Sequence, residues 1–185
     1  MSRLTALIML ILASPLLAFI SLAILLGDGR PLFFTQERLG LQLKGISIFK
    51  FRTMRGGKIF SFFADWLRYT GLDELPQLIN IMKGDMNWVG PRPLPIAYKP
   101  ILTDKEKKRF RVKPGVIGLV QVRGRNGLSW SQKFRYDRFY AENKNYKLDL
   151  FLLFSAFKQL INRLKTLSVK SLESQPAADL RAQRS

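Results

Sequence analysis

Two adjacent carboxylates, Asp73 and Glu74, are the side chains in this sequence best suited to catalysis or to binding a metal ion. Apolar residues at helical spacing follow them as far as Gly84, which predicts that the pair lies at or near the N-terminus of a helix. Pro76 is tolerated there because the first turn does not use the N–H that proline lacks. Free backbone N–H groups at such a terminus attract phosphate and favour an ionised carboxylate. The pair would also simply favour the start of a helix, so its function depends on the residues around it.

Two arginines lie close to this pair in the sequence. Arg92 occupies the proline-rich turn 90–93, where its guanidinium is a good partner for phosphate oxygens. Arg68 precedes Asp73 by five residues, close enough to face the same site across the turn at Gly71. Together they make a phosphate-bearing ligand the natural partner of this stretch.

Three further cations are candidate phosphate-binding residues. Lys50 and Arg52 share one face of a predicted strand over residues 46–54, which is either a solvated face or a phosphate-binding edge. Arg125 and Arg123 lie among glycines, where backbone N–H groups can approach an anion closely. Glycine-rich basic loops are often merely turns, so this loop alone does not identify a site.

The composition restricts the chemistry. The chain has 185 residues, enough for one modest domain with attachments, and it contains neither cysteine nor histidine. Thiol nucleophiles and the usual general base are therefore excluded. Only Arg3 is charged before Gly27, and the rest of the chain carries 30 Lys and Arg against 13 Asp and Glu, a net charge of +17. This surplus predicts an anionic partner: nucleic acid, lipid headgroups or a phosphorylated substrate.

The segment from Leu4 to Leu26 is uncharged and mostly apolar. As a straight helix it would be roughly 35 Å long, enough to cross a bilayer core of about 30 Å. Ser14 and Pro15 interrupt it at the centre, and each half alone would be about 17 Å long, too short to cross. From the residues alone, a kinked span is favoured over a re-entrant hairpin, and a cleaved signal peptide ranks last.

The remaining sequence alternates short strands with amphipathic helices. Residues 32–40 and 46–54 read as strands, and residues 58–69 as an aromatic-rich helix suited to a core or to a membrane interface. Thr103 and Glu106 have capping-box spacing at the start of a short basic helix. Residues 116–122 read as strand-like, residues 131–143 and 148–164 as helices, and the polar residues from about 168 onward as a disordered tail.

Taken together, these segments resemble the bacterial sugar transferases, specifically the small monotopic phosphoglycosyl transferases. The resemblance covers residues 3 to 150. The sequence carries the Ser14–Pro15 break and the motifs FTQERLG, FKFRTM, LRYTGLDELPQLINIMKGDM, VGPRP, RFRVKPGVIGLVQVRGRN and YDRFYAEN. This series is long, specific and in the family's order.

The resemblance implies an enzyme that transfers a phosphosugar from a UDP-sugar to a polyprenol phosphate such as undecaprenyl phosphate, releasing UMP. It implies a ping-pong mechanism in which Asp73 is the nucleophile and forms a covalent aspartyl phosphosugar, with Mg²⁺ bound beside Asp73 and Glu74. Arg68 and Arg92 match the family pattern. The chemistry is consistent, because phosphate nucleophiles need charge neutralisation rather than a histidine base. Such enzymes catalyse the first membrane step of bacterial glycoconjugate assembly.

The resemblance also implies the architecture: an α+β, mostly helical fold with amphipathic interface helices and a small β element. Residues 1–27 would form a re-entrant helix–break–helix hairpin, 28–167 a basic catalytic domain on the cytoplasmic face of the bacterial inner membrane, and 168–185 a disordered tail. Membrane lipids are then a partner, and nucleic acid is not. Leu119, Val120 and Arg123 depart from the family pattern, which leaves the sugar open. The alternative is a membrane-tethered basic module that binds nucleic acid or lipid without catalysis.

Overall fold

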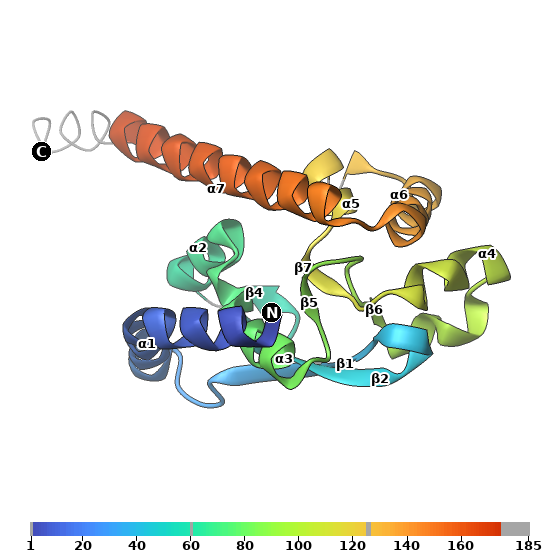
Figure 1. The fold of residues 1–185 in the computed structure, drawn as a ribbon. Helices are drawn as coiled ribbons and strands as arrows, with labels where there is room; N and C mark the ends of the chain where they lie inside the picture. Colours follow the sequence, from blue (N-terminus) through green and yellow to red (C-terminus); the bar gives the residue numbers. More distant parts are fainter. Residues whose placement is uncertain (1, 60, 125–126, 175–185) are drawn as a thin grey trace, which may run out of the picture.

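The structure is a computed structural model, and it describes residues 2–59, 61–124 and 127–174. It is mostly helical with three small sheets, as the α+β prediction requires (Figure 1). In chain order the elements are α1 (Ser2–Gly27), β1 (Phe33–Leu39), η1 (Leu41–Leu43), β2 (Gly45–Phe51), β3 (Met54–Arg55), β4 (Lys58–Ile59), α2 (Phe62–Thr70), η2 (Leu72–Gln77), α3 (Leu78–Lys83), β5 (Asn87–Val89), β6 (Leu94–Pro95), η3 (Ile96–Ile101), α4 (Asp104–Lys107), η4 (Lys108–Arg111), β7 (Gly115–Ile117), α5 (Leu119–Arg123), α6 (Trp130–Asn143) and α7 (Tyr146–Ser174).

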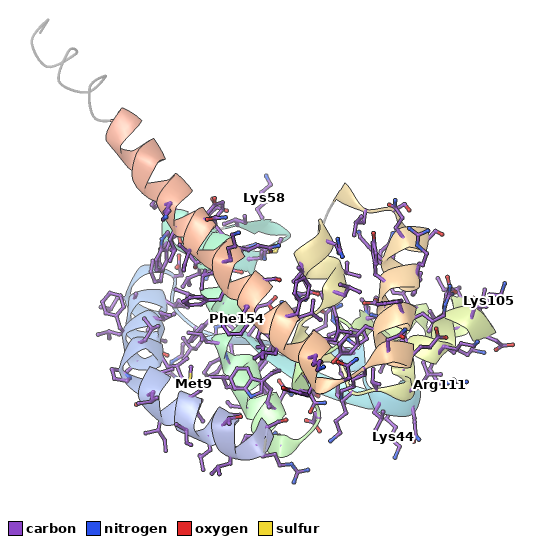
Figure 2. The ribbon with its side chains drawn as sticks, turned by 45° about the horizontal axis from the view of Figure 1, so that its top comes forward. Met9, Lys44, Lys58, Lys105, Arg111 and Phe154 are labelled. Carbon is purple, nitrogen blue, oxygen red and sulfur yellow. The ribbon has the colours of Figure 1, made fainter. Side chains whose placement is uncertain are left out.

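Helix α1 is long and apolar enough to cross a membrane by length and composition. It differs from the expected helix–break–helix, because one helix runs through Ser14 and Pro15 and its ribbon changes direction part-way along (Figures 1 and 2). Pro15 cannot donate to the carbonyl of Ile11, and the Ser14 hydroxyl donates to that carbonyl instead, at 2.7 Å. The helix therefore bends without leaving this carbonyl unpaired.

Both halves of α1 pack on the rest of the protein. In the first half, Ala6 is buried with Ile48 and Ile81. In the second half, Ile20 is buried with Phe51. The opposite face is a surface of exposed apolar side chains, and in Figure 2 the labelled cations Lys44, Lys105 and Arg111 lie at the far end of the molecule from this helix. The exposed apolar face of α1 thus lies at the opposite end of the molecule from these three cations (Figure 2).

The two strands predicted here are present as β1 and β2. They pair with each other as an antiparallel hairpin, and β6 adds to the outer side of β1. Strand β2 ends at Phe51, so Lys50 lies within the sheet while Arg52 follows it. The predicted helix over 58–69 begins later than expected, because Lys58 and Ile59 pair with β3 and Ser61 caps the helix by accepting from the backbone N–H of Ala64.

Asp73 and Glu74 lie in a helical segment that is bounded by Gly71 and Gly84. Helix α2 ends at Gly71, which has the left-handed conformation (φ 81°) that a residue with a side chain adopts at a cost. The chain then makes the six-residue 3₁₀ helix η2, which carries Asp73 and Glu74 in its first turn and continues into α3. Helix α3 ends at Gly84, as the sequence predicts. The predicted helix start is confirmed, with a tighter 3₁₀ first segment.

The C-terminal half contains two corrections. The strand predicted over 116–122 is wrong beyond Ile117, because Gly118 precedes a helical turn, α5, that buries Leu119 against Tyr140 and Leu152. A disordered tail was predicted from residue 168, but helix α7 continues to Ser174. Residues 175–185 lie outside the described part. The capping box of Thr103 and the helices near 131–143 and 148–164 are confirmed.

Candidate active site

A cavity of about 560 Å³ opens beside η2 and is bordered by β2, α2, η3 and α6. Its size is typical of small-ligand sites. The cations that line it are Arg38, Lys50, Arg68, Arg92, Arg109 and Lys133, against the carboxylates Asp73, Glu74 and Asp137. The wall therefore carries a surplus of positive charge that suits an anionic ligand.

Asp73 is buried in the wall of this cavity, with 7% of the residue exposed. Burial raises the pKa of its carboxyl group, and the adjacent Glu74 raises it further, while Lys50, Arg68 and Arg92 act in the opposite direction. Within the described ranges, its carboxylate makes no hydrogen bond or ion pair. Both of its oxygens are therefore available to a substrate or a metal ion.

Glu74 has the opposite environment. Its Oε1 accepts from Lys50 Nζ at 2.7 Å and from Arg92 Nη2 at 2.5 Å, and its Oε2 accepts from Arg92 Nη1 at 3.3 Å. Burial alone would raise the pKa of Glu74, but these two cations override it and hold the pKa at about 2. The two neighbouring carboxylates thus differ: Glu74 is ionised and paired with two cations, whereas Asp73 has no such partner in the part of the chain that the structure describes.

The predicted cations Arg68, Arg92 and Lys50 all line the cavity. Arg68 is exposed and donates to Thr53 Oγ1 at 3.3 Å, so its remaining N–H groups can turn to a ligand. Lys50 and Arg92 both donate hydrogen bonds to Glu74, from which they are separated by 24 and 18 residues in the sequence.

Sequence reasoning missed Arg38, a residue of β1. Its guanidinium lies in the cavity wall, where Nη1 donates to the carbonyl of Pro93 at 3.2 Å and Nη2 contacts Gln36. Burial lowers the pKa of Arg38, and the nearby Arg92 lowers it further. The available signal was its place in the FTQERLG motif.

A buried ion pair, also missed, supports the turn that carries Arg92. Arg109 Nη2 donates at 2.6 Å to Asp137 Oδ2 and at 2.6 Å to the backbone carbonyl of Arg92. The two side chains are 2% and 7% exposed. Because the acceptor is the carbonyl of Arg92 itself, this pair fixes the backbone from which that guanidinium reaches Glu74.

Comparisons with known proteins identify the family of the chain. The family model for bacterial sugar transferases matches residues 1–163. The chain is 40% identical over 162 residues to the uncharacterized sugar transferase EpsL of Bacillus subtilis, covering 81% of this chain and 80% of that protein. It belongs to the bacterial sugar transferase family.

Two longer relatives are similar to this sugar transferase over part of their own length. The UDP-glucose:undecaprenyl-phosphate glucose-1-phosphate transferase of Escherichia coli is 32% identical, over 85% of this chain and 39% of that protein. The undecaprenyl-phosphate galactose phosphotransferase of Salmonella typhimurium is 31% identical, with the same coverage. The chain thus spans less than half of these two relatives, and their names differ in the sugar at nearly equal identity.

One sequence-predicted residue of the sugar transferase lies away from the cavity. Arg52 is not among the described residues that line the cavity. Its Nε donates to the carbonyl of Pro31 at 2.6 Å, and its Nη2 donates to the carbonyls of Asp28 and Gly29 at 2.9 and 2.8 Å. It therefore holds the connection between α1 and β1. Arg125 lies outside the described residues.

Proposed function

We propose that this sugar transferase moves a sugar phosphate from a UDP-sugar to a polyprenol phosphate, with release of UMP. One observation carries the proposal: the buried carboxylate of Asp73, which has no hydrogen-bond partner among the described residues, lies in a cation-rich cavity beside a second carboxylate already neutralised by Lys50 and Arg92. The names of two relatives specify undecaprenyl phosphate as a substrate of those enzymes. The product would enter bacterial glycoconjugate assembly.

Asp73 is the nucleophile in this proposal. Its carboxylate oxygen forms a bond to the phosphorus that bears the sugar, and the bond from that phosphorus to the bridging oxygen breaks, so UMP leaves with the electron pair. The polyprenol phosphate oxygen then attacks the same phosphorus, and Asp73 departs as a carboxylate. Splitting the transfer into two displacements is the usual benefit of a covalent intermediate.

The cations of the cavity supply electrostatic stabilisation. Attacking and leaving groups are anions, so neither displacement needs a proton removed, and the absence of histidine from the sequence is no obstacle. Arg68 and Arg38 border the space in front of Asp73 and neutralise charge on the transferred and leaving phosphates. Arg92 and Lys50 keep Glu74 charged but shielded, so that it repels the substrate less.

The residues present fit Mg²⁺ as a cofactor. This ion takes one or two carboxylates together with substrate phosphate oxygens. Asp73 offers an oxygen for it, and Glu74 would have to release Lys50 or Arg92 to become a second direct ligand. Among the residues that the structure describes, no group of three or more metal-ligating side chains competes as a site. When bound, the ion would neutralise the diphosphate.

We also propose that α1 enters the membrane and returns, with the catalytic domain on the cytoplasmic face. Three observations support this topology: the bend at Pro15, the packing of residues 6 and 24 on the same domain, and the apolar outer face of the helix. A straight span would carry one end of α1 roughly 35 Å or more away from the other. The basic domain also follows the positive-inside rule.

Single cysteines test the topology, since the chain has none of its own. With Ser2→Cys, Arg30→Cys and Lys105→Cys in sealed inverted membrane vesicles, we expect a membrane-impermeant maleimide to label all three from the outside. Lys105 is exposed on the catalytic domain and serves as the reference for its side. Labelling of position 2 only after the vesicles are opened would establish a crossing helix instead.

The function is tested with the purified full chain in detergent. We expect repeated turnover, measured as more than one UMP released per enzyme, only when Mg²⁺ and undecaprenyl phosphate are both present. Without undecaprenyl phosphate, UMP release should stop at one equivalent per enzyme. A panel of UDP-glucose, UDP-galactose and their N-acetylated amino counterparts identifies the donor. Failure to release UMP from any UDP-sugar, with tight and salt-dependent binding of oligonucleotides instead, would overturn the proposal in favour of a basic binding module.

A further inference from the structure

The cavity has a second end with a different chemical character. Tyr98 from η3 and Trp130 from the start of α6 line it, with ring centroids 5.4 Å apart and planes tilted by 37°. Lys133 also lines the cavity, with its Nζ 5.0 Å from the centroid of the Trp130 ring. Trp130 is half exposed, at 50%, although its ring also packs on Phe134 at 5.9 Å. A half-exposed aromatic ring beside the charged residues of this cavity suits a ligand with a flat surface.

Arg38 lies near both ends. It pairs with Pro95 in the sheet, three residues before Tyr98, and its Nη1 donates to the carbonyl of Pro93, the neighbour of Arg92. Its Nε is buried and has no hydrogen-bond partner among the described residues. A buried guanidinium N–H without an acceptor is costly, and a phosphate oxygen in the cavity would satisfy it if the side chain turned toward the ligand.

We propose that the aromatic end binds the nucleobase of the sugar donor, with Trp130 as its stacking surface. The inference rests on the proposed function, because that function places the reacting phosphorus at Asp73. The sugar is bonded to this phosphorus and must lie close to Asp73. The nucleobase lies one phosphate and one ribose further away. In this arrangement each part of the ligand lies beside a different part of the cavity wall. The reacting phosphorus lies at Asp73, the leaving phosphate at Arg38, and the base at Tyr98 and Trp130.

A base held by stacking gains affinity without a requirement for a particular hydrogen bond. Stacking of one base on an aromatic side chain changes affinity by roughly 10- to 100-fold. Lys133 Nζ lies over the Trp130 ring, and when a base takes that face the ammonium can donate to a carbonyl oxygen of the base or to the ribose. Trp130 is therefore a binding residue for the leaving nucleotide, separate from the residues that carry the phosphoryl transfer.

The test measures the binding of UMP, which carries the base and phosphate but no transferred sugar. In Trp130→Leu, which keeps apolar volume and removes the aromatic face, we expect the Kd for UMP and the KM for the UDP-sugar to rise about tenfold or more. The KM for undecaprenyl phosphate should stay unchanged. Trp130→Phe should restore most of the affinity. The matched control is Phe139→Leu, since Phe139 is exposed on the same helix and does not belong to the cavity wall among the described residues.

Each other outcome overturns the inference in a distinguishable way. If Trp130→Leu raises the KM for the UDP-sugar but leaves UMP binding unchanged, the ring contacts the sugar and not the base. If neither constant moves while the wild type turns over, the aromatic end is only a packing cluster. A wild type that neither binds nor releases UMP would refute the proposed function, and the subsite with it. Thermal unfolding of every variant, with Trp130→Ala included in the series, excludes misfolding as the cause of a change in UMP binding or KM.

Discussion

Asp73→Asn is expected to abolish UMP release, with a fall in rate of roughly a thousandfold or more. The amide has the same shape as the carboxylate but cannot form the phosphoanhydride-like bond to the sugar-bearing phosphorus. Protein quenched during turnover and analysed by intact mass spectrometry should carry one phosphosugar in the wild type and none in the variant. Peptide mapping should place that mass on residue 73. Full activity of Asp73→Asn, or an adduct on another residue, would contradict the mechanism.

Stability measurements separate this effect from unfolding. Because burial and the neighbouring Glu74 raise the pKa of the Asp73 carboxyl, its ionised form is disfavoured in the folded protein, and a neutral amide should leave the melting temperature unchanged or higher. The matched control is Asp104→Asn. Asp104 is 97% exposed in helix α4, outside the cavity wall as described, and its replacement should leave activity unchanged.

Among the single substitutions proposed for this protein, Asp137→Ala is expected to lower the free energy of unfolding most. Removing one partner of a buried ion pair leaves the other charge uncompensated, which costs about 3–5 kcal/mol. For a chain of this size we expect the melting temperature to fall by about 10 °C or more. Circular dichroism in detergent measures it. A fall of less than about 2 °C would show that Arg109 finds another partner.

A double variant separates stability from positioning. Burial raises the pKa of Asp137 and lowers that of Arg109, so desolvation outweighs their mutual attraction in each case. Replacing both with apolar residues, as in Arg109→Met with Asp137→Leu, should therefore regain much of the stability. Activity should stay low, because the carbonyl of Arg92 loses its donor and the turn is free to shift. Recovery of both properties would argue that the pair only fills space.

The sequence by itself determined the local structure and the family of this protein. Helical spacing after Asp73 and the glycines at 71 and 84 predicted where the carboxylate-bearing segment begins and ends, because each signal acts over three or four residues. The Thr103 capping box and the β1–β2 hairpin are local in the same sense. The order of motifs was enough to identify a bacterial sugar transferase.

Patterns that depend on distant partners were harder to interpret. Lys50 and Arg52 share a predicted strand face, yet the strand ends between them, and one reaches Glu74 while the other holds the carbonyls of residues 28–31. Residues 116–122 read as one strand, but burial of Leu119 against Tyr140 favours a helical turn there. Short apolar runs do not reveal which neighbour will cover them.

Only the tertiary structure decided how the two carboxylates differ. The sequence places Asp73 and Glu74 side by side as candidate catalytic residues and metal ligands, and the family resemblance names Asp73 as the nucleophile without giving the environment of either carboxylate. Folding brings Lys50 and Arg92 onto Glu74 and leaves Asp73 buried without a hydrogen bond among the described residues. Arg109 and Asp137 fix the turn that makes this possible. The charge and reactivity of a side chain depend on burial and on partners tens of residues away, and no local pattern encodes either.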